Sequence, residues 1–463
     1  MSLFARKSLS LDELHPDHRL KATLSWWHLI PLGVGAIVGT GIYTLIGVGA
    51  NLAGPGVIAS FLIAGAVCAC AALAYAEVAT MIPASGSAYT YSYVVLGEII
   101  AWVVGWSLIL EYSLVVSAVA VGWSGYAVGF LNAVGLHPPA ALSAGLYAGG
   151  LINLPAIAII AVVAGLLMLG ARESATVNAV LVAVKIAALA VFVAVAAPHF
   201  NAANFRPFMP YGFAGHDVGG VRHGVMAAAA IIFFAFYGFD ALSTAAEETK
   251  HPGRDLPIGI IGSMLACTAI YVAVAAAALG AMAAGKFAHS PEPLALILRG
   301  LGQPGVAIGI GAAAVIALPT VILAFLYGQS RIFFVMARDG LLPRGLAKVH
   351  PRTGSPVRMT LATAVVVAVL AGLAPLDQIA SLANAGTLAA FTAVSACMLV
   401  MRRRAPDEPR IYRTPLAWIV GPLAIAGCLY LFWSLPLKTK LFFAAWNLIG
   451  LAGYALWRSR RRP

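Results

Sequence analysis

The chain has 463 residues, of which 61% are hydrophobic and 10% charged, and its formal net charge is +12. A soluble protein of this length needs far more charge on its surface, so the composition excludes an ordinary soluble enzyme and favours one integral membrane domain. The positive charge does not indicate nucleic-acid binding, because the Lys and Arg residues lie in short segments between long apolar runs.

Residues 1–25 carry both acids and bases ahead of the first apolar run, which predicts a cytoplasmic tail rather than a cleaved signal. Apolar stretches long enough to cross a bilayer follow at twelve places. They lie at roughly 26–47, 56–81, 97–130, 154–170, 174–197, 223–248, 257–284, 303–338, 357–373, 376–401, 414–435 and 440–457. The first ten predict a transport core over residues 26–402. The last two predict an addition over 403–457, followed by a basic cytoplasmic tail at 458–463.

The basic residues orient these predicted spans. If both termini are cytoplasmic, 21 of the 29 Lys and Arg residues lie on the inner side and six on the outer side. Because cytoplasmic loops of membrane proteins carry the excess of Lys and Arg, the count favours twelve spans with both ends inside.

Two of the apolar segments are poor helix formers. Four glycines lie within the nine residues from Gly33 to Gly41, and in the other segment Gly238 is closely followed by Asp240. Each glycine costs a helix ~1 kcal/mol relative to alanine, so both segments predict a break. Close packing of small residues between helices is the alternative interpretation. The breaks fall in spans 1 and 6, as in transporters whose spans 1–5 and 6–10 form inverted repeats.

Broken helices expose main-chain groups, which at membrane depth are tolerated where a cavity or ligand satisfies them. Amides at the start of a half-helix favour a carboxylate, whereas carbonyl groups freed by the second break suit an ammonium. The two breaks therefore predict a site for a zwitterion. The candidate residues are Gly39, Thr40 and Gly41 in the first break and Phe234, Ala235, Tyr237 and Gly238 in the second.

Five short runs follow one another along the chain, at 35–42, 105–112, 171–174, 237–240 (continuing to Glu247 and Glu248) and 338–343. Together they resemble the amino acid–polyamine–organocation superfamily, in particular its cationic amino acid transporter branch and bacterial relatives, over about residues 25–455. The resemblance implies an all-α integral membrane protein of about 12 transmembrane helices with a LeuT-type 5+5 inverted repeat, broken in helices 1 and 6.

The resemblance also implies roles for individual residues. Ile37 would offer a carbonyl to the substrate amine, while Thr40 and Gly41 would offer amides to its carboxylate. In the second break, Phe234, Ala235 and Tyr237 would supply further carbonyl groups. Tyr237 departs from the family pattern, which often has an aliphatic residue there. A ring turned inward would shrink the side-chain pocket or add a hydroxyl to it.

Two charged residues lie deep inside predicted spans. Lys185 and Glu111 are about thirteen and fourteen residues into spans 5 and 3, a depth of ~20 Å at the helical rise. A charge there costs at least ~2.5 kcal/mol, so it is paired or functional. One interpretation is a static Lys185–Glu111 ion pair. The other is proton coupling, in which Lys185 gains and loses a proton because burial favours the neutral amine.

The resemblance favours proton coupling. Sodium-coupled transporters of this fold hold Na⁺ between spans 1 and 8, and proton-coupled relatives carry a span 5 lysine whose ammonium takes that place. Lys185 is where that lysine is expected. Glu77 at the end of span 2 is expected to pair with basic loops. For Asp240, Glu247 and Glu248 near the end of span 6, pairing at the helix end or gating is expected, with substrate contact as the less favoured alternative.

Other classes of protein leave signatures that are missing from this sequence. There is no nucleophile motif, phosphate-binding loop or His pair, and the five cysteines have no metal-ligand spacing, so no catalytic residue, metal or cofactor is predicted. A haem-binding redox subunit would carry paired intramembrane histidines, and a channel would show a filter motif or a charged ring.

The sequence therefore predicts a secondary active transporter, a permease that carries a neutral or cationic L-amino acid in symport with protons. A polyamine or organic-cation transporter, an amino acid exchanger and a membrane channel are the alternatives. A polyamine has no carboxylate for the amides of the first break. The expected partners are the substrate, protons and the lipid bilayer, with a small single-span accessory protein left open. The alanine-rich composition and short loops favour a bacterial inner membrane.

Overall fold

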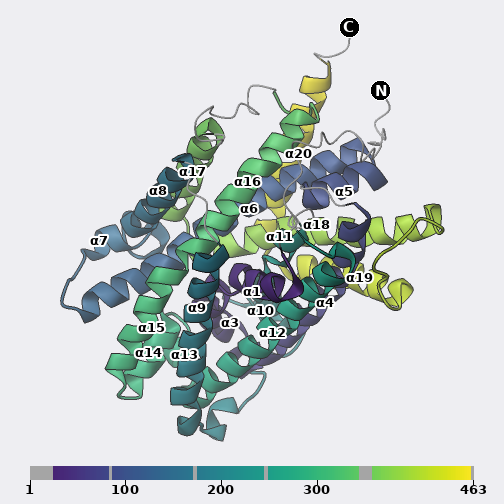
Figure 1. Ribbon diagram of the computed structural model, residues 1–463. Helices are drawn as coiled ribbons and strands as arrows, with labels where there is room; N and C mark the ends of the chain where they lie inside the picture. Colours follow the sequence, from purple (N-terminus) through teal and green to yellow (C-terminus); the bar gives the residue numbers. More distant parts are fainter. Residues whose placement is uncertain are drawn as a thin grey trace.

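The computed structural model describes residues 24–82, 86–169, 175–219, 221–243, 249–343 and 357–459. The tails, the resemblance run at 171–174, and Glu247 and Glu248 lie outside these residues. Most helices run along one common direction, with α13 and α14 at one end of the bundle and the end of α20 at the other (Figure 1). Over these residues helices occupy all twelve ranges in which the sequence predicts a span.

The helices and strands have the following bounds. They are α1 (Trp26–Ile37), α2 (Thr40–Tyr43), α3 (Leu45–Ala53), η3 (Gly54–Gly56), α4 (Val57–Met81), α5 (Ser87–Val95), α6 (Glu98–Ala133), α7 (Ala140–Ser143), η4 (Leu146–Ala148), α8 (Leu154–Met168), α9 (Ala175–Ala196), η5 (Ala197–His199), η6 (Ala202–Phe205), β1 (His216–Val218), β2 (Val221–His223), α10 (Val225–Ile232), η7 (Phe233–Phe236), α11 (Phe239–Ser243), α12 (Pro252–Ala281), α13 (Ala284–Phe287), α14 (Pro293–Gly300), α15 (Pro304–Ala317), α16 (Pro319–Arg338), α17 (Val357–Leu373), α18 (Leu376–Arg404), α19 (Ala417–Ser434) and α20 (Leu437–Ser459).

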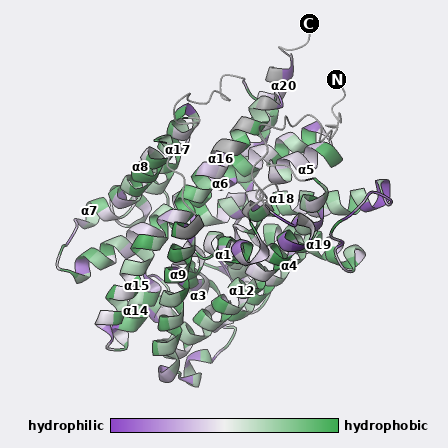
Figure 2. Cartoon of the chain, in the orientation of Figure 1, coloured by the Kyte–Doolittle hydropathy of each residue, from purple (hydrophilic) through white to green (hydrophobic). Residues whose placement is uncertain are grey.

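Length and composition make much of this bundle suited to a membrane. Among the described residues, seven helical segments are long and apolar enough to cross a bilayer, and four shorter helices are apolar as well. Large apolar side chains remain exposed on the outside, including Val365 on α17 at 57% and Leu448 on α20 at 67%. Hydrophilic residues gather instead where helices are joined, most visibly in the loop beside α19 (Figure 2). An apolar exterior of this kind matches lipid acyl chains as the solvent.

Helix α6 lies at the centre of the packing. It contacts α18, α16, α15 and α5, while α1 packs against α12 and α9, and α4 packs against α12 and α19. Helix α20, the last in the chain, is joined to α6 by two reciprocal hydrogen bonds from indole N–H groups to main-chain carbonyls. Trp106 Nε1 donates to the Trp446 carbonyl at 2.9 Å, and Trp446 Nε1 donates to the Trp106 carbonyl at 3.0 Å. Their rings are stacked, with centroids 4.7 Å apart.

Two local features differ from the sequence prediction. Span 8 is divided into α15 and α16 at Leu318, because Pro319 has no N–H and a proline is favoured at the first position of a new helix. A two-stranded antiparallel hairpin pairs β1 with β2 before α10, so the chain is not purely helical. Both features depend on a few residues, whereas a hydropathy scan averages over a whole span and so does not detect them.

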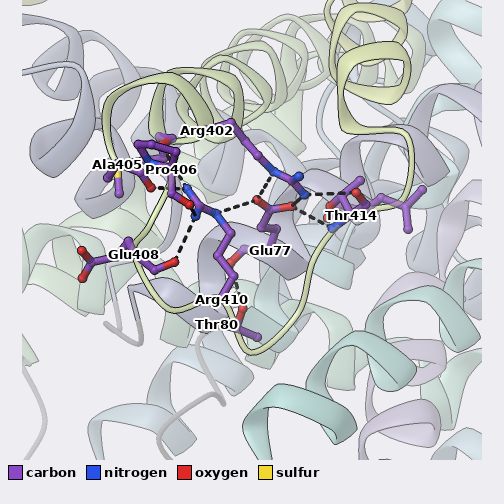
Figure 3. A network of polar contacts seen from close by, with 10 residues as sticks. Glu77, Thr80, Arg402, Ala405, Pro406, Glu408, Arg410 and Thr414 are labelled. Carbon is purple, nitrogen blue, oxygen red and sulfur yellow. Dashed lines mark hydrogen bonds and ion pairs between the residues drawn. The ribbon is translucent and has the colours of Figure 1, made fainter.

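Glu77, near the end of α4, pairs with Arg402 in the last turn of α18 and with Arg410 in the loop that follows, which confirms the expected pairing with basic residues of this region. The side chain is fully buried. Its two carboxylate oxygens each accept a 2.7 Å hydrogen bond from Arg402, and Oε2 also accepts from the Thr414 amide at 2.8 Å (Figure 3). Arg410 Nε lies 3.4 Å from Oε1, and its guanidinium donates to four main-chain carbonyls, one in the last turn of α18 and three in the loop that follows. The carboxylate thus organises residues 402–414 around the end of α4.

Candidate functional site

The first break separates α1 from α2. Helix α1 ends at Ile37, Val38 is extended, and Gly39 has φ −148° and ψ −148°. Because α2 starts afresh at Thr40, the amides of Gly39, Thr40 and Gly41 donate no hydrogen bond to any described residue. These are the free N–H groups expected at a helix start, and they belong to the residues for which the sequence predicts carboxylate binding.

The second break follows α10. The helix tightens into the 3₁₀ turn η7, Tyr237 is extended with φ −65° and ψ 152°, and α11 restarts at Phe239. Gly238 supplies the turn between them with φ +111°, a left-handed conformation that glycine adopts without strain. The glycine positions in the sequence therefore locate both helix breaks. Close packing through small residues, the alternative interpretation, occurs at the same glycines together with the breaks.

The two breaks touch each other. A Cβ built on Gly41 would lie 2.3 Å from Ala235 Cα, and one on Gly238 would lie 2.7 Å from the Ala36 carbonyl carbon. The hydroxyl of Tyr271 on α12 lies between them, 2.9 Å from the Ile37 carbonyl oxygen and 2.8 Å from that of Ala235. Two of the four predicted carbonyl groups, those of Ile37 and Ala235, are thus brought together, whereas the Phe234 carbonyl accepts from the Tyr237 amide at 3.4 Å.

Lys185 lies beside the first break. The residue is 1% exposed on α9, and its Nζ donates to the Gly35 carbonyl at 3.0 Å and to Thr320 Oγ1 at 2.9 Å. The Thr320 hydroxyl in turn donates a hydrogen bond to the Ala317 carbonyl at 2.8 Å. The ammonium therefore joins span 5 to span 1 and to the start of α16, where Pro319 divides span 8.

Glu111 lies elsewhere, so the interpretation of a static Lys185–Glu111 ion pair is wrong: none joins these two described residues. Glu111 is 1% exposed and packs against Gly386 of α18, and one carboxylate oxygen, Oε2, has no hydrogen-bond partner among the described residues. Similar depth along two helices did not make the residues neighbours, because the rotation of each helix decides which face a side chain occupies.

Asp240 is also inside the bundle rather than at the end of span 6. The break restarts the helix just before it, so Asp240 falls in the first turn of α11 and is 3% exposed. Its carboxylate accepts from the Tyr112 hydroxyl at 3.3 Å and from the Gly238 amide at 3.3 Å.

The Tyr237 ring points toward α18. Its hydroxyl donates to Asn384 Oδ1, and its ring lies beside Phe234, with centroids 5.0 Å apart. Phe233 also contacts the ring, at 6.0 Å and nearly perpendicular. The aromatic residue that departs from the family pattern is therefore held at the break by a polar partner on span 10.

Sequence reasoning missed three residues of this arrangement: Tyr271, Thr320 and Asn384. Asn384 carried a usable signal, since a fully polar amide inside an apolar span is costly and generally functional. Tyr271 and Thr320 carried little, because tyrosine and threonine are ordinary residues of membrane helices. Across the described chain there is no group of three or more His, Cys, Asp or Glu side chains able to hold a metal ion.

Residues 24–456 match the family model described as amino acid permease. The branched-chain amino acid permease BcaP of Bacillus subtilis (strain 168) is 46% identical over 462 residues, covering 98% of this chain and 97% of that protein. The methylthioribose transporter of the same strain is 42% identical over 460 residues, covering 98% of each. The vacuolar cationic amino acid transporter 4 of Arabidopsis thaliana is 36% identical over 417 residues, or 88% of this chain and 68% of that one. These matches confirm the resemblance that the motifs indicated.

Proposed function

Because the chain belongs to the amino acid permease family of multi-pass membrane transporters, and not to a family of enzymes, we propose that it couples amino acid uptake to proton entry. The proposed architecture has twelve spans, both termini in the cytoplasm and spans 1–5 and 6–10 as inverted repeats, in a bacterial inner membrane. Spans 1 and 6 carry the substrate site at their breaks, as the architecture requires.

The contact between the two breaks supports a zwitterionic substrate. The free amides of Gly39, Thr40 and Gly41 take the carboxylate. The Ile37 and Ala235 carbonyls keep a second lone pair beside the one facing Tyr271, and these lone pairs accept the ammonium. Both ends of the substrate are thereby held by main-chain dipoles, with no side-chain charge buried against it.

The Lys185 ammonium is the observation that carries proton coupling. When protonated, it donates to Gly35 in span 1 and Thr320 in span 8, and so holds the first break against the neighbouring helix. Release of the proton to the cytoplasm removes the charge-assisted bond to Gly35, which loosens the break and frees the substrate. Glu111, with an unpartnered carboxylate oxygen, is the second proton-coupling residue of the proposal.

The two Bacillus relatives and the site favour a neutral substrate, while the Arabidopsis relative keeps a cationic amino acid as the alternative. The first substrate to test is a branched-chain amino acid, after the Bacillus permease, since the second break is lined by apolar rings. Methylthioribose is the competing candidate, after the 42% identical transporter. A ribose has hydroxyls but neither an ammonium nor a carboxylate, so the two breaks would have no zwitterion to hold.

Uptake by the purified chain in sodium-free proteoliposomes tests the proposal. Labelled leucine, isoleucine and valine are supplied with an inward proton gradient, without a gradient, and with a protonophore. Accumulation only under the gradient, together with acidification of the lumen, is expected. Exchange that ignores the gradient would overturn proton coupling, and uptake of methylthioribose or polyamines in place of every amino acid would overturn the zwitterion site.

A further inference from the structure

Asn384 of α18 is a fully buried amide whose polar atoms are all engaged. Its Nδ2 donates to the carbonyls of Ala230, at 2.6 Å, and Ile231, at 2.9 Å. Its Oδ1 accepts from the Tyr237 hydroxyl. Asn384 thus holds span 6 on both sides of its break, at the last turn of α10 and at the extended residue that follows η7.

The orientation of this amide is determined by its partners. The two carbonyls can only accept, so the NH₂ group must face them and Oδ1 must face Tyr237. Rotating the amide would set oxygen against two carbonyl oxygens. Since Oδ1 cannot donate, the Tyr237 hydroxyl is the donor, and the direction of its O–H bond is set by span 10.

The position of the Tyr237 ring follows from that bond. Tyr237 comes directly after η7, two residues from the Ala235 carbonyl, and its ring packs on Phe234 and Phe233. We propose that Asn384 is a positioning residue that holds Tyr237 in one place and thereby sets the size of substrate side chain the second break accepts. This inference rests on the proposed amino acid site at the breaks.

Two single variants and their combination test the bond. Tyr237→Phe removes one oxygen and keeps the ring, and Asn384→Ala removes the anchor. Asn447→Ala is the matched control, because Asn447 is also an asparagine on a membrane helix that donates to a main-chain carbonyl, that of Phe443, at 3.0 Å. Initial rates in proteoliposomes give kcat and KM for valine, leucine and phenylalanine with each protein.

The expected result is a change in selectivity rather than a uniform loss. With the ring released, kcat/KM for phenylalanine relative to valine rises about tenfold in both single variants, the size of effect that small changes in an apolar pocket produce. The double variant changes the ratio no further than either single variant, because both remove the same interaction. Asn447→Ala keeps the wild-type ratio.

Two results would overturn the inference: an unchanged phenylalanine-to-valine ratio in Tyr237→Phe, or effects that add in the double variant. The ratio does not depend on how much protein folds, and Tyr237→Phe decides the question if Asn384→Ala does not assemble. The wild-type protein separates this inference from the function. If it transports no amino acid, the proposed function fails, whereas wild-type transport with unaltered selectivity in the variants defeats only the role of Asn384.

Discussion

Lys185 and Gly35 are 150 residues apart in the chain, yet the ammonium nitrogen of one lies 3.0 Å from the carbonyl oxygen of the other. Only glycine fits at position 35, because a Cβ there would lie 2.3 Å from the Val182 side chain on α9. The absence of a side chain lets α9 approach α1 closely enough for this bond. The close approach of α9 to α1 therefore brings the Lys185 amine to the edge of the first break.

Replacement of Lys185 separates coupling from binding. In Lys185→Ala the proton-driven step is lost, so the internal amino acid concentration should not exceed the external one, while counterflow exchange continues. Lys185→Arg keeps a charge that does not titrate below about pH 12, so its transport should lose pH dependence. Accumulation and counterflow in proteoliposomes between acidic and alkaline external pH measure both. Wild-type accumulation by Lys185→Ala would contradict the coupling role.

The contact between the two breaks predicts a strong effect of Gly41→Ala. The added methyl group would overlap Ala235, whose Cα lies 2.3 Å from the built Cβ, and would force spans 1 and 6 apart. We expect uptake to fall to background while the protein still migrates as a monodisperse species in detergent. Gly165→Ala is the control, because nothing lies within 4 Å of its built Cβ and alanine favours a helix by ~1 kcal/mol. Equal uptake by the two variants would refute a close contact.

Tyr271→Phe tests the hydroxyl that joins the breaks. The hydroxyl has a single hydrogen, shared between the Ile37 and Ala235 carbonyls, so its loss removes one buried donor, at about 1–3 kcal/mol for a group left unsatisfied. We expect kcat/KM for uptake to fall at least about tenfold, mainly through KM, since the carbonyl groups proposed to bind the substrate ammonium lose their alignment. Tyr430→Phe on α19, where the side chain is 47% exposed, should be neutral. An unchanged KM in Tyr271→Phe would show that the hydroxyl does not shape the site.

Glu77→Gln tests the network at the end of α4. The substitution keeps the shape of the side chain but removes the charge between Arg402 and Arg410, and breaking a buried ion pair costs about 3–5 kcal/mol. The melting temperature in detergent should fall by several degrees. The same change at exposed Glu408 in that loop should leave it unaltered. A melting temperature equal to wild type for Glu77→Gln would show that the network adds no stability.

Much of the fold and part of the site could be predicted from the sequence, and particular residues show why. Both breaks lie where Gly39, Gly41 and Gly238 weaken a helix, since backbone preference acts within a few residues. The pairing of Glu77 with a basic loop was also predictable, because a charge at the end of an apolar run needs a counterion. The Lys185–Glu111 pair was not formed, although the two depths matched. Depth along a helix does not say on which face a side chain lies, and that face depends on how the helix is rotated in the bundle.

The sequence by itself determined the membrane character, the family and the positions of both breaks, because apolar runs, glycine clusters and ordered motifs are local properties of the chain. Only the tertiary structure decided which groups meet at those breaks. Lys185 reaches Gly35 and Thr320, Tyr271 spans the Ile37 and Ala235 carbonyls, and Asn384 holds Tyr237. Each of these contacts joins helices far apart in the sequence. Their partners are chosen by how the helices rotate and pack against one another, which no local pattern of residues encodes.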